Sequence, residues 1–141
     1  MLLSCRFLNK VADVNTFSYT NQLNFTQGDT VTVYLQLVDA SVDLPSDGFN
    51  PPYRRYMPAV GATLQVTISN LDQSKQIVRF ASQPFPLDPS IWSFPILATD
   101  KVVGTISILL KLTEGGVITY GTAIGGIGVG SQNPGIGCCS C

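Results

Sequence analysis

The sequence contains no histidine and little charge, and both shortages narrow the functions open to it. Without an imidazole, the chain has no catalytic triad of the usual serine or cysteine type and no histidine ligand for a metal. Charged residues make up 12% of the 141 residues, and eight basic side chains against nine acidic ones give a net charge of −1. Such a balance offers no electrostatic footprint for nucleic acid or an anionic membrane. We therefore predict a non-enzymatic protein without cofactor or metal, which binds neither nucleic acid nor membrane.

Long apolar runs are also missing. No run approaches the roughly 18 to 20 residues that a membrane span needs. The opening MLLSC resembles a lipobox ending at Cys5, but it lacks a charged leader and an apolar stretch, and the polar Arg6 follows at once. We expect a soluble protein whose first residues form a β-strand.

What the chain does contain is a repeated alternation of apolar and polar residues. In residues 31–37, 62–68 and 106–112 the apolar side chains fall at every second position, which is typical of a half-buried strand and not of a helix. Sheets with one apolar face must stack or close, so the pattern predicts an antiparallel β-sandwich, immunoglobulin-like or jelly-roll-like. The residues expected in its core are Val33, Leu35, Leu64, Val66, Ile106, Ile108 and Leu110.

Weaker strand patterns lie between the strong ones. Residues 90–96 alternate so that Trp92 and Phe94 share one face with Ile96. The sequence LTEGGVITYG predicts a tight hairpin, because Gly115 and Gly116 supply the positive φ angles that such turns need. We expect about six to eight short strands and no helix.

One domain is predicted over residues 1–122, with a long loop over residues 43–61. The loop contains four prolines, three aromatic residues and two adjacent arginines. Aromatic and arginine side chains anchor protein interfaces, so we predict that this loop contacts another subunit. The alternative is a solvated loop whose arginines only balance nearby aspartates. The predicted contact residues are Tyr53, Arg54, Arg55 and Tyr56.

A glycine-rich arm is predicted over residues 123–141. Glycine is entropically expensive to order and contributes no side chain to a core. We therefore expect an extended arm that leaves the sandwich and becomes ordered on a neighbouring subunit. The apolar side chains that it would bury there are Ile124, Ile127, Val129 and Ile136.

The four cysteines are distributed unevenly. Cys138, Cys139 and Cys141 lie in the last four positions, and Cys5 is the fourth. Structural zinc sites space paired cysteines by two to four residues, which disfavours a site built on adjacent thiols. Inert reduced thiols are one alternative. We predict instead that at least one tail cysteine forms an intersubunit disulfide, with Cys5 of a neighbour or with a cysteine of another protein.

Three stretches together carry a family resemblance: FTQGDTVTVYLQLVDA, FPLDPSIWSFPI and GTISILLKLTEGGVITYG. Over roughly residues 17–122 the chain resembles the small β-sandwich modules of tailed-bacteriophage virions, above all the N-terminal attachment domain of siphophage baseplate upper proteins. The cysteine tail departs from that family. The resemblance implies a virion structural protein of the tail, baseplate, collar or capsid decoration, made in the host cytoplasm. Its expected partners are other virion proteins and further copies of itself, and no catalytic residues are implied.

The alternative function is a receptor- or carbohydrate-binding β-sandwich module. Trp92, Tyr53 and Tyr56 would then serve as stacking platforms for sugar rings. Because Trp92 shares its alternating face with Phe94 and Ile96, we expect it in the core, which favours the assembly role.

Overall fold

The computed structural model describes residues 2–8, 19–20, 22–26, 28, 30–43, 53–70, 76–97, 100 and 104–130. Within these residues the chain forms eleven strands and no helix, and so offers no apolar helix long enough to cross a membrane. The strands are β1 (Leu3–Leu8), β2 (Tyr19–Thr20), β3 (Gln22–Thr26), β4 (Val31–Asp43), β5 (Tyr53–Arg55), β6 (Thr63–Asn70), β7 (Gln76–Ala81), β8 (Ile91–Ile96), β9 (Gly104–Glu114), β10 (Val117–Ile124) and β11 (Gly126–Gly130).

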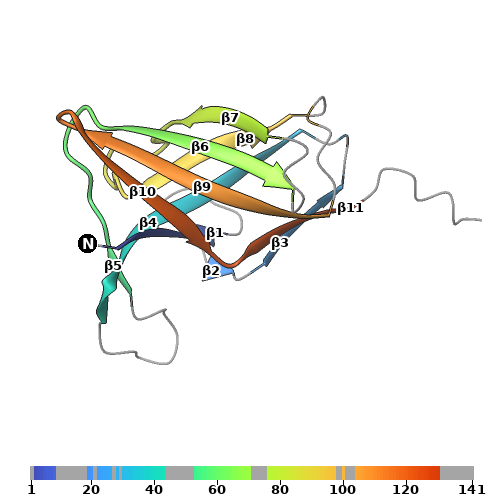
Figure 1. Cartoon of the computed structure of the whole chain (residues 1–141), viewed down its shortest axis with the longest axis horizontal. Coiled ribbons are helices and arrows are strands. Elements are labelled where there is room, and N and C mark those ends of the chain that lie inside the picture. Colours follow the sequence, from blue (N-terminus) through green and yellow to red (C-terminus); the bar gives the residue numbers. More distant parts are fainter. Residues whose placement is uncertain are drawn as a thin grey trace, which may run out of the picture.

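The strands belong to one sheet that curls strongly (Figure 1). Its main series runs β7–β6–β9–β10–β1–β4–β8 in hydrogen-bonding order. At the two ends of this series, Ser82 and Ser93 exchange backbone hydrogen bonds of 2.9 and 2.8 Å. The sheet therefore bends until β7 and β8 meet, and the apolar side chains are enclosed between its opposite walls.

The predicted all-β class is confirmed, but the sheet is not purely antiparallel. β1 pairs with β10 in parallel, and β3 pairs with β11 in parallel. The alternation of apolar residues specifies which face of a strand points inward. It does not specify the direction of the neighbouring strand, so the insertion of β1 between β10 and β4 leaves no trace in that pattern.

The core lies where the sequence pattern predicted it. One cluster contains every predicted core residue, together with Trp92, Phe94 and Ile96, each at most 5% exposed. β1 is buried along its whole length. Its Leu3, Cys5 and Phe7 belong to the main cluster, while Leu8 contacts Ile91 in a second one. The predicted core residues found in the cluster are Val33, Leu35, Leu64, Val66, Ile106, Ile108 and Leu110.

Glycines permit the fold at two places. Gly115 and Gly116 have φ angles of 54° and 84° in the β9–β10 turn, which confirms the predicted hairpin. Gly121 lies against β1 so closely that an added Cβ would stand 2.3 Å from the carbonyl oxygen of Leu3. A residue larger than glycine at position 121 would therefore force β1 and β10 apart.

The sheet continues past Ala123, where an extended arm was expected to begin. β10 runs through Ile124, and β11 pairs with both β9 and β3. Ile127 and Val129 are buried in this chain's own core, while Ile124 is half-buried. The amide side chains of β3 lie close against two glycines of β11: an added Cβ would stand 3.0 Å from Gln22 Oε1 at Gly126 and 3.1 Å from Asn24 Oδ1 at Gly128. Residues 131–141, with Ile136 and the three tail cysteines, lie outside the described residues.

Candidate functional site

The predicted contact loop is partly built into the sheet. β5 pairs with β4, with Asp39 opposite Arg54 and an irregularity before Asp43. Residues 44–52 and the side chain of Tyr53 lie outside what the structure describes. The segment of residues 56–61 then runs from β5 toward the tip of the β9–β10 hairpin (Figure 1). The loop therefore contributes a strand and an exposed segment at this end of the molecule.

A single carboxylate fixes this segment. The Tyr56 hydroxyl donates to Glu114 Oε1 over 2.5 Å, and the Ala59 backbone N–H donates to Glu114 Oε2 over 2.8 Å. The Tyr56 backbone N–H also donates to the Leu37 carbonyl oxygen over 2.8 Å. Glu114 lies at the last position of β9, so it connects the loop to the hairpin. No local pattern marks Glu114 as a site residue, because its partners lie more than fifty positions away.

Tyr56 is a structural anchor of this chain. The hydrogen bond to Glu114 is the main cause that raises the pKa of Tyr56 to about 12, with smaller contributions from burial and from the negative charges of Glu114 and Asp39. The phenol consequently stays protonated and remains a donor at every physiological pH. We had expected Tyr56 as a contact residue for another subunit; the structure places its hydroxyl on Glu114.

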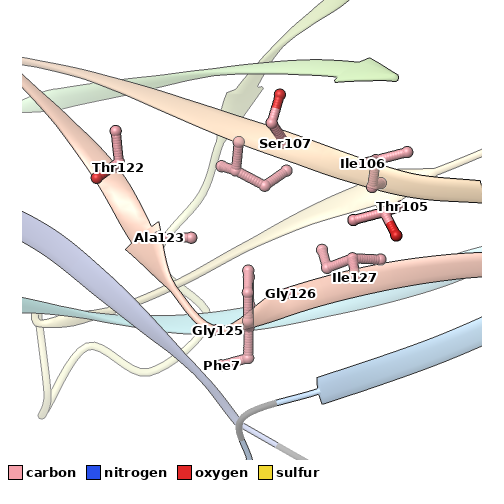
Figure 2. Close-up of a pocket in the computed structure, with 10 residues that line it drawn as sticks. Phe7, Thr105, Ile106, Ser107, Thr122, Ala123, Gly125, Gly126 and Ile127 are labelled. Atoms are coloured by element: carbon pink, nitrogen blue, oxygen red, sulfur yellow. The ribbon is translucent and has the colours of Figure 1, made fainter. Parts of the chain in front are cut away.

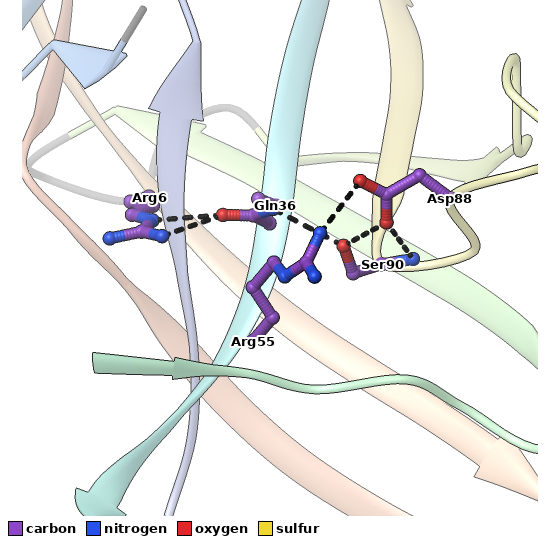
Figure 3. Close-up of polar contacts among 5 residues, drawn as sticks. All are labelled: Arg6, Gln36, Arg55, Asp88 and Ser90. Atoms are coloured by element: carbon purple, nitrogen blue, oxygen red, sulfur yellow. Dashed lines mark hydrogen bonds and ion pairs between the residues drawn. The ribbon is translucent and has the colours of Figure 1, made fainter. Parts of the chain in front are cut away.

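A second polar network ties β5 to the interior (Figure 3). Arg55 Nη1 donates to Asp88 Oδ2 over 3.2 Å, and Asp88 Oδ1 accepts from the Ser90 hydroxyl over 2.5 Å. Gln36 Nε2 donates to the Ser90 hydroxyl oxygen over 3.3 Å, and its Oε1 accepts from Arg6 Nε and Nη2 over 3.0 and 2.8 Å. The chain of contacts thus leads from the surface to β1.

The contribution of each contact to stability depends on how deeply its side chains are buried. Gln36 and Ser90 are fully buried, and Arg6 and Asp88 are each 6% exposed. Removing one member would leave a buried partner unsatisfied, which is costly. Arg55 is 54% exposed, so its ion pair with Asp88 stabilises the fold only modestly.

Apolar side chains next to these anchors face solvent. Met57 is 49% exposed and Val60 is fully exposed, and both lie on the segment that Glu114 holds. Val117, which pairs with Glu114, is 65% exposed. We define the end surface as Arg54, Arg55, Met57, Val60 and Val117. It combines arginines with exposed apolar side chains on a tethered backbone, the composition that protein interfaces favour.

Cys5 does not resemble a reactive thiol. It is fully buried in the main cluster, and burial raises its pKa to about 12. Disulfide exchange requires an accessible thiolate, so the expected pairing of a neighbour's tail with Cys5 conflicts with the folded structure. Cys138, Cys139 and Cys141 lie outside the described residues.

A cavity of about 220 Å³ opens where β9 changes its partner from β10 to β11 (Figure 2). Phe7, Ile106 and Ile127 contribute apolar walls, and Thr105 and Thr122 contribute hydroxyl groups. Its lining contains no titratable side chain. Across the described part of the chain, Cys, Asp and Glu side chains nowhere gather in a group of three that would hold a metal ion.

No family of known proteins and no curated protein matches the chain. Among solved structures, it is similar to part of an endo-β-1,4-mannanase from Thermotoga petrophila, with 13% sequence identity and a TM-score of 0.45. The likeness covers 94% of this chain and 20% of the mannanase. A likeness at this level assigns neither a fold family nor an activity to the chain.

Proposed function

We propose that this chain is a non-enzymatic structural protein of a tailed-phage virion, made in the host cytoplasm, which binds neighbouring subunits through its end surface. The observation that carries the proposal is the contrast between Val60, fully exposed, and the hydrogen bond that fixes Ala59 beside it to Glu114. An apolar side chain held in water on a tethered backbone contributes nothing to the monomer. It gains free energy when a partner covers it.

A two-layer β-sandwich arrangement is part of the same proposal. We expect the two walls of the curled sheet to act as the layers of a β-sandwich module, as in the virion modules that the sequence resembles. A module of this kind presents its ends and loops to neighbours while its core stays closed. Val60 and Val117 of the end surface lie beside the β9–β10 turn, while Arg54 and Arg55 lie on β5.

The proposal is tested first at the level of the particle. Mass spectrometry of purified virions, from the phage or prophage whose genome encodes the chain, should find it in stoichiometric amounts. Its absence from the particles would contradict a virion role.

The end surface is tested with a matched pair of variants. The triple variant Arg54→Ser, Met57→Ser, Val60→Ser leaves Tyr56 and Arg55 in place, so the tethered backbone should keep its fold. We expect the triple variant to be excluded from particles. The control Leu87→Ser, which changes a 91% exposed side chain outside the end surface, should be incorporated normally. Normal incorporation of the triple variant, with an unchanged circular-dichroism spectrum, would show that the end surface makes no contact.

The alternative function, carbohydrate recognition, is weakened at two of its three expected platforms. Trp92 is 3% exposed and belongs to the core, and Tyr56 is bonded to Glu114. The side chain of Tyr53, the third expected platform, lies outside the described residues, so its role stays a prediction.

A further inference from the structure

The outer face of the β7–β6–β9–β10 region carries a row of four side chains across four strands. Phe80 pairs with Gln65, Gln65 pairs with Lys111, and Lys111 pairs with Tyr120. Directly paired residues point to the same face of a sheet. We call this set the aromatic row. Its two outer members are strongly exposed, Phe80 at 69% and Tyr120 at 60%.

The next row along the same strands repeats the arrangement. Val78, 52% exposed, pairs with Thr67, and Thr67 pairs with Leu109, 44% exposed. Leu109 in turn pairs with Thr122. The two rows contain one charged residue, Lys111, among eight side chains.

On this face, the exposed apolar side chains lie on strands other than β6. β6 presents Thr63, Gln65 and Thr67 outward, all of them hydrogen-bonding residues, while its apolar residues are buried. β7 lies on one side of β6 and β9 and β10 lie on the other, as Figure 1 shows. The face is therefore a polar strip between two margins with apolar and aromatic side chains.

The dimensions follow from the strand spacing. Neighbouring strands lie about 4.8 Å apart, so three spacings place Phe80 and Tyr120 about 14 Å from one another. Successive rows on one face are about 7 Å apart, because two residues separate them along each strand. The distance between the two aromatic rings thus fits a short oligosaccharide laid across the strands.

The chemistry of this face selects among possible ligands. A protein interface concentrates its apolar side chains at the centre, where lysine is depleted, whereas this face has polar groups at its centre. Nucleic acid needs several cations along its backbone, whereas these two rows offer one. A neutral sugar ring has an apolar C–H face that stacks on aromatic rings and hydroxyl groups that pair with amides and hydroxyls. We propose that this face binds a neutral oligosaccharide, with Phe80 and Tyr120 as stacking platforms and Gln65 and Thr67 as hydrogen-bonding groups.

The test uses the full chain on a printed array of neutral and anionic glycans, followed by calorimetric titration with the neutral oligosaccharide that binds best. We expect Phe80→Leu and Tyr120→Leu to bind about threefold to tenfold more weakly, because leucine keeps apolar area and loses the ring. Phe80→Trp and Tyr120→Trp keep a ring and should retain wild-type affinity. Leu87→Ala is the control, since it changes an exposed apolar residue outside the face.

Three results would overturn the proposal. These are an array without any neutral glycan bound, equal affinities for the ring-retaining and leucine variants, and binding confined to anionic glycans. Sedimentation velocity of the same variants adds a fourth. A wild-type oligomer that dissociates in Phe80→Leu, without glycan binding, would make the face a contact between copies. None of these residues belongs to the end surface, so the particle experiments can fail or succeed independently.

Discussion

The end surface and the aromatic row are both exposed, but they are positioned by different means. At the end surface, side-chain hydrogen bonds of Tyr56, Arg55 and Glu114 hold a segment that the sheet alone does not fix. In the aromatic row, backbone register between β7, β6, β9 and β10 places every side chain. A surface that is positioned by backbone pairing should keep its geometry when its side chains are substituted. A surface that is positioned by side-chain hydrogen bonds should lose its geometry when one of those side chains is removed.

The largest expected effect comes from the core that both surfaces share. Leu64 is fully buried, and β6 and β9 connect the aromatic row to the hairpin that ends at Glu114. Leu64→Ala should lower the free energy of unfolding by about 2 to 5 kcal/mol, because it leaves a cavity. Urea unfolding measures this directly. A loss below about 0.5 kcal/mol, the range of surface substitutions, would place Leu64 outside the core.

A smaller loss of stability is expected from a substitution in the sheet, away from the end surface. Gly121→Ala introduces a Cβ against the Leu3 carbonyl oxygen, and we expect a loss of about 1 to 3 kcal/mol from the forced separation of β1 and β10. Gly130→Ala is the matched control, because its Cβ would meet nothing closer than 3.7 Å. Thermal unfolding of both variants checks the difference. Equal stabilities would show that β1 and β10 lie further apart than described.

The tether of the end surface should make stability depend on alkaline pH. The pKa of Tyr56 is raised to about 12 in the fold from an ordinary value of 10.0. The folded state therefore keeps a proton that the unfolded state loses, and the stabilisation present below pH 10 disappears as the pH rises to about 12. Tyr56→Phe should cost about 1 kcal/mol at neutral pH through the lost hydrogen bond.

Unfolding free energies of wild type and Tyr56→Phe, measured from pH 8 to 12, test this prediction. Cys5 also has a raised pKa and acts in the same direction, so only the difference between the two proteins isolates Tyr56. We expect that difference to shrink with rising pH. A difference that stays constant would mean that Glu114 does not hold the phenol.

The smallest effect on the fold is expected from the tail cysteines. We propose that Cys138, Cys139 or Cys141 forms an intersubunit disulfide, and that Cys5 does not take part because it is buried. On non-reducing gels, assembled wild-type material and Cys5→Ala should both show covalent multimers that collapse with reductant. The triple variant Cys138→Ser, Cys139→Ser, Cys141→Ser should run as monomer. Multimers lost in Cys5→Ala instead would restore Cys5 as the partner.

Local periodicity predicted the core well and the pairing of strands poorly. The burial of Val33, Leu64 and Ile108 could be predicted from the alternation of apolar and polar residues next to them in the sequence. The parallel contact of β1 with β10 depends on residues at opposite ends of the chain. An alternation pattern contains no such information.

The candidate sites show the same division. Arg54 and Arg55 were chosen from residue type and are both exposed on β5, while their contact with another subunit stays a prediction. Glu114 and the partners of the buried Gln36 were missed, because contacts over dozens of positions have no local pattern. One misjudgement was avoidable: residues 126–130 alternate glycine with isoleucine and valine, which is itself the period of a strand.

The position of β1 in the sheet also determines when the core can close during synthesis. β1 pairs with β2 and β4, which are made soon after it, and with β10, which is made much later. Contacts across such a separation slow folding. During synthesis the core stays open along β1 until β10 has emerged. Cys5, fully buried in the finished protein, is therefore accessible to oxidants only before β10 completes the core.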